Sequence, residues 1–243
     1  MIIEKYKYLG NGKYKIIIDN NEFTIYEDII LKYSILGKDT ITKKELDECL
    51  KDNDFYEAYY KSVNYIKKRL RSKKEIRKYL TKDYSDKTIT NVIEKLTKEG
   101  YLDENIFTDA YIMDQINLKV SGPIKIENEL IKLGISKDII EKHLQIFTKD
   151  EQYQKIRKII KKEINLNKNK SEVMLKNKLL KSLIDKGFFK EDILSCIEEY
   201  DFDDSKIYEV EYKKAYDKLS KKYSGKELEY KIKEKMYQKG FRV

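Results

Sequence analysis

The chain has 243 residues, of which 40% are hydrophobic and 39% charged, with 1 proline, 9 glycines and no tryptophan. Such a composition favours exposed helices around thin cores over a sheet-rich fold, and the lack of a signal-peptide pattern or of any run of about 18 apolar residues predicts a cytoplasmic protein with no membrane partner. The formal net charge of +9 favours a polyanionic partner, although an acidic protein would also be attracted.

Residues 1–26 predict a three-stranded antiparallel sheet. Apolar and polar residues alternate in segments 13–19 and 22–26, and residues 2–9 supply a third strand. The expected turn between the last two strands is the dipeptide Asn20-Asn21, because short polar residues tolerate the positive φ that tight hairpins need. The result is a small β-meander with one apolar face.

Segment 27–36 is amphipathic and is expected to cover that face. Thr42 and Glu45 have the spacing of a capping box, which predicts a short helix through Leu50. We therefore predict that residues 1–53 form an N-terminal cap of strands and short helices.

The next segment, residues 54–105, predicts three helices. The first is expected over about 54–70. Ser72 and Glu75 form a second capping box, which opens the middle helix, and the third helix spans about 86–99. This three-helix unit is the first copy of a repeat.

The apolar positions of its middle helix recur at intervals of 50, 53 and 53 residues. The aligned sets are Ile76, Ile126, Leu179 and Ile232, then Leu80, Leu130, Leu183 and Met236, followed by Gly134, Gly187 and Gly240 in the last three copies. A period near fifty residues with helix-sized pieces is typical of a stacked helical array.

The predicted fold is thus mainly α: tandem three-helix repeats in an elongated curved array behind the β cap. The repeats are expected over residues 54–105, 106–150 and 151–203, with a truncated fourth copy over 204–243.

Leading helices of the later repeats are expected over 107–117, 151–165 and 204–223, joined in the third repeat by a Lys/Asn-rich link. Gly122-Pro123 predicts the start of a middle helix, because proline fits the first helical turn. Ser224 with Glu227 predicts another capping box.

No catalytic constellation is evident in the sequence. The single histidine, His143, aligns with the inward positions Val92 and Cys196, so we expect it to be buried and structural, and we expect both cysteines to be reduced core thiols. The acidic run 201–204 is compatible with a metal site for phosphodiester cleavage, but a loop followed by a helix cap at Ser205 is the favoured interpretation. We predict that the protein is not an enzyme and has no metal or cofactor.

Basic residues are concentrated in two stretches. Ten lie between Lys61 and Lys82 with only Glu75 against them, and ten lie between Lys155 and Lys181. A solvated lysine-rich helix face is the alternative for each stretch. Those at the junction of the first two helices of repeat 1 are the strongest binding candidates: Lys67, Lys68, Arg69, Arg71, Lys73, Lys74 and Arg77.

This pattern of motifs resembles the RecX family, the small regulators of the bacterial RecA recombinase. The resemblance depends on Arg69-Leu-Arg-Ser72 with Glu75-Ile76 and Tyr79-Leu80, on Gly100-Tyr-Leu-Asp-Glu104 with Phe107 and Tyr111, and on Gly122-Pro123 with Ile126 and Glu129-Leu130 before Gly134-Ile135. The chain departs from the pattern at Asp83, which replaces the glycine of later copies, and in segment 113–117, which lacks the usual basic residues and leaves Lys119.

The resemblance implies a non-enzymatic monomer that lodges in the groove of the RecA filament on DNA and restrains ATP hydrolysis and strand exchange, in recombination, DNA repair and the SOS response. Lys119 and the candidates of repeat 1 are then expected to face the filament or its DNA.

Two alternatives stay open. One is a helical-repeat protein that binds single- or double-stranded DNA directly without a recombinase, for which Tyr65 and Tyr79 would have to be exposed, whereas their spacing favours the core. The other is an adaptor for an acidic protein.

Overall fold

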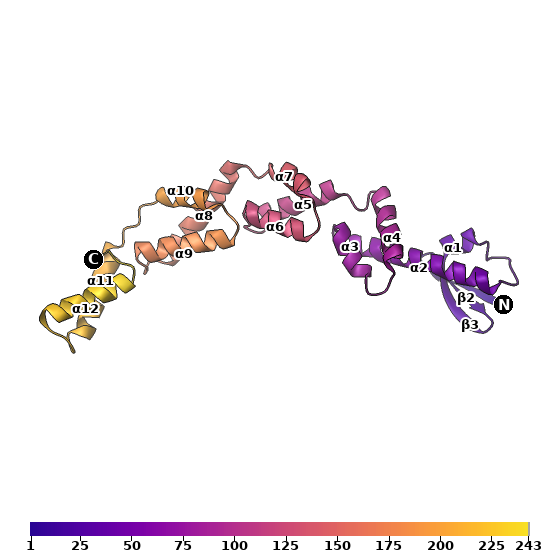
Figure 1. Cartoon of the computed structure of the whole chain (residues 1–243), viewed down its shortest axis with the longest axis horizontal. Coiled ribbons are helices and arrows are strands. Elements are labelled where there is room, and N and C mark those ends of the chain that lie inside the picture. The colour runs from indigo at the N-terminus through magenta and orange to yellow at the C-terminus, as the bar shows by residue number, and fades with distance from the viewer. Residues whose placement is uncertain (243) are drawn as a thin grey trace. The chain divides into compact units, whose positions relative to one another are not determined.

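The computed structural model describes residues 1–242. In that range the chain forms three strands, β1 (Ile3–Gly10), β2 (Lys13–Ile18) and β3 (Asn21–Tyr26), followed by twelve helices (Figure 1). The predicted fold class, mainly helical with an N-terminal three-stranded antiparallel sheet, is confirmed. No helix within these residues has the length and apolar character needed to cross a bilayer.

The sheet is a meander of order β1-β2-β3. Its second turn lies one residue earlier than predicted, at Asp19-Asn20, because Ile18 pairs with Asn21. Both turn residues have positive φ, 44° and 64°, as a two-residue hairpin turn with the strand twist requires. This register places Ile18 on the buried face.

That face is covered by α1 (Glu27–Lys32), as predicted, and also by the first half of α2 (Lys43–Ile66). The capping box of Thr42 and Glu45 is present at the start of α2. The buried residues of this core are Ile3, Ile16, Ile18, Ile25, Ile29, Ile30, Ile35, Ile41, Leu46 and Cys49.

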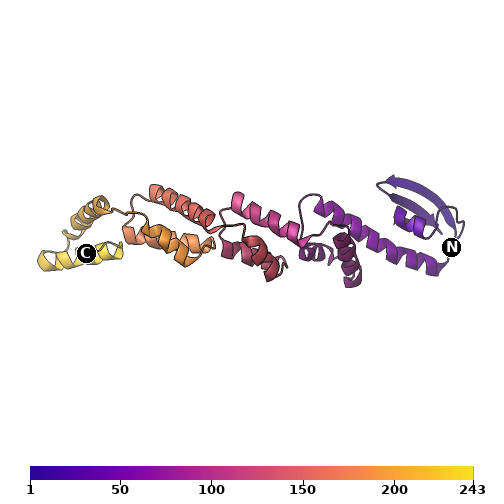
Figure 2. The same ribbon diagram turned by 90° about the horizontal axis from the view of Figure 1, so that it is seen from above.

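Helix α2 is continuous, which corrects the prediction of two helices with a break after residue 53 (Figure 2). The polar residues that suggested the break, Asp52 and Asn53, form hydrogen bonds with the end of α1 and with the sheet. Asn53 accepts a hydrogen bond from the Tyr26 backbone N–H at 2.9 Å and donates one to the Thr24 carbonyl at 3.0 Å. Asp52 accepts from the Tyr33 hydroxyl at 2.7 Å. The predicted boundary of the cap therefore falls inside a helix.

The second half of α2 packs with α3 (Lys73–Leu80) and α4 (Asp86–Lys98) to form the first three-helix unit. Its core is made by Val63, Ile66, Ile76, Leu80, Ile89, Val92, Leu96 and Leu102, with Ala58. The predicted capping box of Ser72 and Glu75 opens α3.

The remaining helices follow the predicted order. They are α5 (Glu104–Asn117), α6 (Pro123–Lys132), α7 (Lys137–Leu144), α8 (Lys149–Leu166), α9 (Glu172–Asp185), α10 (Lys190–Glu198), α11 (Ser205–Leu219) and α12 (Gly225–Gln238). Thr148 and Glu151 form a further capping box, which was not predicted. The box expected at Ser224 is absent, because Gly225, the first residue of α12, adopts a non-helical φ of +56°.

The predicted repeat is confirmed by the burial of its aligned apolar side chains. Every middle-helix position in the two aligned apolar sets is at most 2% exposed. Gly134, Gly187 and Gly240 all have positive φ, at +88°, +87° and +78°. Phe188 and Phe241 each donate a backbone hydrogen bond five residues back, to Leu183 and Met236, so these middle helices end with the same C-terminal motif.

These glycine loops also dock onto the start of the middle helix one repeat earlier. Gly122 N–H donates to the Lys186 carbonyl at 2.7 Å, and Ile124 N–H donates to the Gly187 carbonyl at 3.0 Å. The Ser171 hydroxyl donates to the Lys239 carbonyl at 2.6 Å. The contacts therefore satisfy polar groups at the starts of α6 and α9.

A β-carbon on the glycines would meet the docked helix. It would lie 3.1 Å from the Lys74 β-carbon at Gly134, 2.4 Å from the Lys125 nitrogen at Gly187, and 2.8 Å from the Ser171 hydroxyl at Gly240. The first copy has Asp83 at this loop instead. Among the described residues no middle helix precedes the first repeat, so its loop needs no such close approach.

Candidate functional site

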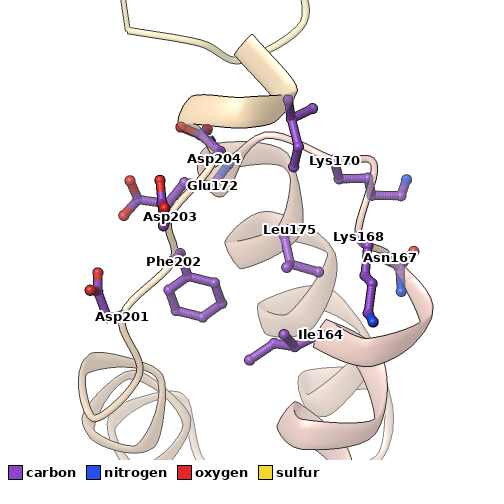
Figure 3. Close-up of a pocket in the computed structure, with 11 residues that line it drawn as sticks. Ile164, Asn167, Lys168, Lys170, Glu172, Leu175, Asp201, Phe202, Asp203 and Asp204 are labelled. Carbon is purple, nitrogen blue, oxygen red and sulfur yellow. Dashed lines mark hydrogen bonds between the residues drawn. The ribbon is translucent and has the colours of Figure 1, made fainter. Parts of the chain in front are cut away.

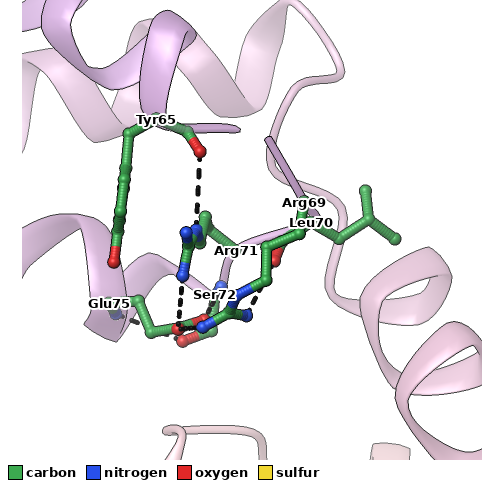
Figure 4. A network of polar contacts seen from close by, with 6 residues as sticks. All are labelled: Tyr65, Arg69, Leu70, Arg71, Ser72 and Glu75. Atoms are coloured by element: carbon green, nitrogen blue, oxygen red, sulfur yellow. Dashed lines mark hydrogen bonds and ion pairs between the residues drawn. The ribbon is translucent and has the colours of Figure 1, made fainter. Parts of the chain in front are cut away.

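The junction between α2 and α3 is held by Glu75. Its carboxylate accepts a hydrogen bond from the Ser72 backbone N–H at 3.0 Å, and its own N–H donates to the Ser72 hydroxyl at 3.2 Å. The same carboxylate pairs with Arg69 at 2.6 Å and with Arg71 at 3.4 Å (Figure 4). One acidic side chain thus caps α3 and fixes two arginines of the connecting turn.

Arg71 is turned into this junction, contrary to the expectation that it faces a partner. Its side chain is only 9% exposed. The guanidinium carbon lies 3.6 Å from the centre of the Tyr65 ring, and Nε donates to the Tyr65 carbonyl at 3.5 Å; Figure 4 shows the guanidinium beside the ring. A planar guanidinium stacks readily on an aromatic face, so Arg71 supports the turn rather than forming its surface.

Two further predicted residues, the half-exposed Lys73 and the exposed Arg77, each form an ion pair with a carboxylate. Lys73 lies 3.2 Å from Glu104, and Arg77 lies 3.7 Å from Asp86 and donates to the Thr90 hydroxyl at 3.3 Å. Solvent-accessible ion pairs of this kind contribute little, typically below about 1 kcal/mol. Both cations can therefore exchange these partners for a phosphate or carboxylate.

Lys67, Lys68 and Lys74 are exposed and form no ion pair within residues 1–242. Lys78 and Lys82, which were not chosen as candidates, are also exposed and form no ion pair within these residues. Their spacing of one and two helical turns after Lys74 could have identified them from the sequence. We call the solvent-accessible cations of residues 67–82 the basic junction: Lys67, Lys68, Arg69, Lys73, Lys74, Arg77, Lys78 and Lys82. Lys119 is also exposed, but it belongs to the other of two compact units and is not grouped with this surface.

Tyr79 lies at the edge of the basic junction and is 42% exposed, which corrects the prediction that it is in the core. Its ring is stacked on that of Tyr65, with centroids 4.3 Å apart and planes at 15°. Ile76 and Leu80 fill the core side of α3, so Tyr79 is left at the rim.

The remaining candidates do not assemble a reactive site. His143 is turned inward as predicted, with a side chain 12% exposed, but its Nδ1 lies 2.5 Å from Asp109 of α5, a carboxylate that the spacing did not point to. Cys49 and Cys196 are both buried, as predicted, and burial raises the pKa of the Cys49 thiol to about 11, which disfavours the nucleophilic thiolate.

The acidic run 201–204 is a loop beside a pocket of about 330 Å³ (Figure 3). Asp203 accepts hydrogen bonds from the Ser205 N–H and hydroxyl at 3.0 and 2.7 Å. Asp204 accepts one from the Glu172 N–H at 2.7 Å, at the start of α9. Lys168 and Lys170 line the same pocket, and residues 1–242 contain no group of three His, Cys, Asp or Glu side chains suited to a metal. The carboxylates of Asp203 and Asp204 bond at helix starts, so the interpretation of the run as a loop before a helix holds. The cap predicted at Ser205 is wrong, because the N-cap of α11 is Asp204, which makes no side-chain cap hydrogen bond, and Ser205 is the first residue of the helix.

Fold and surface together define a tandem three-helix-repeat protein with cations gathered on its first repeat. Residues 58–96 match the family model described as RecX, first three-helix domain. Over 242 residues the chain is 30% identical to the regulatory protein RecX of Bacillus cytotoxicus, covering 95% of this chain and 89% of the relative. It is 28% identical to that of Halalkalibacterium halodurans over 243 residues, covering 96% and 91%.

Two solved structures have the same fold. A crystal structure of regulatory protein RecX superimposes with a TM-score of 0.69 at 22% identity, covering 82% of this chain and 99% of that one. The structure of RecX from Lactobacillus salivarius gives 0.56 at 28% identity, covering 61% and 97%. The chain belongs to the RecX family of regulatory proteins.

Proposed function

We propose that the protein binds the RecA filament on DNA and lowers its ATP hydrolysis and strand exchange, as a non-enzymatic cytoplasmic regulator in recombination, DNA repair and the SOS response. Membership of a family of regulatory proteins supports this proposal. The observation that carries it is the basic junction, where Lys67, Lys68 and Lys74 are exposed and unpaired within residues 1–242. They lie on the turn after α2 and at the start of α3, which Glu75 holds together.

In the proposed mechanism a monomer lies with its array of repeats along the filament groove and bridges neighbouring protomers. The basic junction meets DNA phosphates or an acidic filament surface, to which clustered cations are attracted. Bridging occludes the groove and resists the protomer motions that accompany ATP hydrolysis. No bond is made or broken by the protein itself.

The test is a triple reversal, Lys67→Glu, Lys68→Glu and Lys74→Glu, which spares the internal Arg71. We expect inhibition of RecA-dependent ATP hydrolysis and strand exchange to need roughly tenfold more protein or higher, because each attraction becomes a repulsion. The matched control, Lys5→Glu, Lys7→Glu and Lys44→Glu, makes the same change of net charge at exposed sites of the N-terminal cap. Equal inhibition by both variants would contradict the proposal.

The second candidate function, direct DNA binding without a recombinase, is favoured by one observation, the exposed ring of Tyr79 beside the basic junction. Affinities for bare DNA and for RecA-coated DNA at equal ionic strength separate the two. A regulator of the filament binds coated DNA more tightly, a direct binder prefers bare DNA, and an adaptor for an acidic protein binds neither.

A further inference from the structure

We infer that the outer face of Tyr79 is a stacking site for an unpaired base of single-stranded nucleic acid. The inference deepens the proposed function and depends on it for the setting, because it adds a contact to bases beside the proposed contacts to phosphates. It concerns a residue for which the sequence pattern predicted burial.

The stacking geometry leaves one aromatic face open. The Tyr65 ring has the Arg71 guanidinium 3.6 Å from its centre and the Tyr79 ring at 4.3 Å, nearly parallel. Two flat groups at these distances cannot share a face, so Tyr65 is sandwiched between them. Tyr79 then has one face covered by Tyr65, and within residues 1–242 its ring and hydroxyl make no other polar or aromatic contact.

The open face is held in position before any ligand arrives. Arg71 is fixed by Glu75 at 3.4 Å and by the Tyr65 carbonyl at 3.5 Å, and Glu75 is fixed by Ser72 at the start of α3. Tyr65 and Tyr79 are also anchored on two different helices, α2 and α3. A rigid aromatic surface binds with a small loss of conformational entropy.

The charges around this face suit the backbone that accompanies a base. Lys82 lies about one turn after Tyr79 and Lys68 about one turn after Tyr65, which is the spacing of neighbours on a helix surface. Lys78 precedes Tyr79 in α3 and adds to the positive charge of the segment. All three are exposed and form no ion pair within the described chain. An aromatic platform among cations is the arrangement that binds single strands with little sequence preference. A duplex offers no free base face in its interior, so the site should prefer single strands.

The chain has no tryptophan, so Tyr79→Trp supplies a unique fluorescent reporter on a ring that still stacks. We expect its emission to be quenched by a thymidine oligonucleotide and not by a duplex of equal length. Tyr101→Trp is the matched control, since Tyr101 is also 42% exposed and forms no aromatic stack among residues 1–242. Quenching of both reporters alike would overturn the inference.

Affinity for the same oligonucleotide supplies the second measurement. We expect Tyr79→Phe to bind like the parent protein and Tyr79→Leu to bind roughly tenfold more weakly, because one base–aromatic stack is lost. Tyr101→Leu should be unchanged, and thermal unfolding of each variant checks that the fold is kept. Unaltered binding by a folded Tyr79→Leu variant would overturn the inference.

The two proposals fail differently. If Tyr79 stacks on bases but the protein does not regulate RecA, oligonucleotide binding depends on Tyr79 while RecA-dependent ATP hydrolysis is unaffected by any variant. If the protein regulates RecA without stacking, the lysine reversals weaken inhibition as described above and Tyr79→Leu inhibits normally.

Discussion

Glu75 has three roles that a sequence pattern does not reveal together. Its spacing from Ser72 predicts the capping box, but the pattern says nothing of Arg69 and Arg71, which share its carboxylate. Because the Arg71 side chain is 9% exposed, its charge needs this partner more than an exposed arginine would. Glu75 therefore connects the start of α3 to the stack of Arg71 on Tyr65.

Glu75→Gln keeps a side chain able to cap Ser72 but removes the negative charge between the arginines. We expect a loss of roughly 1.5–3 kcal/mol in the local unfolding free energy of α3, the range of hydrogen bonds to charged groups. Hydrogen exchange of the α3 amides measures it. The control is Glu94→Gln, at an exposed position of α4 that forms no ion pair within residues 1–242, and an equal effect of both changes would show that the arginine pairs contribute nothing.

The glycine loops show how one helix repeat contacts the next. Gly100 and Gly187 have similar φ values of +79° and +87°. A β-carbon on Gly100 would meet nothing within 4 Å, whereas on Gly187 it would meet the backbone of Lys125 at 2.4 Å. Gly100 thus serves only the left-handed backbone, and Gly187 serves both the backbone and the docking of its loop onto α6.

This pair allows a matched experiment. Gly100→Ala should destabilise its repeat by about 1–2 kcal/mol, the usual cost of a left-handed residue with a side chain. Gly187→Ala should cost more and should also expose the Gly122 and Ile124 amides, which donate to the docked loop. Hydrogen exchange at these two amides reports the undocking. If they remain as protected in Gly187→Ala as in Gly100→Ala, the loop contact does not hold the repeats together.

Across the chain, the net charge of +9 combines 52 basic and 43 acidic residues. Many cations are paired: Lys61 with Glu57, Lys95 with Glu99, and Arg157 with Glu199. The basic junction differs in its local charge, because its cations lie between residues 67 and 82 with Glu75 as the one acidic residue of that segment. Affinity for a polyanion should therefore depend on this surface rather than on net charge alone.

The salt dependence of DNA binding tests whether affinity depends on the basic junction or on the net charge of the whole chain. Neutralising Lys67, Lys68 and Lys74 to Gln should lower the log–log salt slope for single-stranded DNA by about 2, at roughly 0.7 per phosphate contact. Neutralising Lys5, Lys7 and Lys44 removes the same charge and should leave the slope unchanged. Tyr79→Leu should weaken binding without altering the slope, since stacking releases no counterions. An equal fall in slope for both lysine sets would indicate nonspecific attraction.

The repeat frame was predictable because it depends on local spacing. Aliphatic residues that recur at helical intervals must share a buried face whatever lies opposite them, so spacing alone assigned Ile76, Ile126, Leu179 and Ile232 correctly to the core. The resemblance to the RecX family also depended on such local motifs. Capping boxes succeeded where regular helix follows, as at Thr42 and Ser72, and failed at Ser224 before a glycine with positive φ.

Contacts between residues distant in sequence were not predictable in this way. Asn53 was assigned to a helix break because its partners, Thr24 and Tyr26, are 29 and 27 residues away. The partner of His143, Asp109, is 34 residues away. The sequence pattern around such a polar residue is the same whether its side chain faces solvent or bonds to a distant partner.

Spacing along the chain was therefore enough to predict most of the helices, their repeat and the resemblance to the family, but not the continuity of α2. The direction of Arg71 into the junction, the exposed face of Tyr79 and the docking of the glycine loops were decided by packing. The physical reason is the distance along the chain over which each signal acts. Helical periodicity involves residues a few positions apart, whereas these contacts depend on which helix ends meet in space. That meeting follows from the packing of the whole repeat.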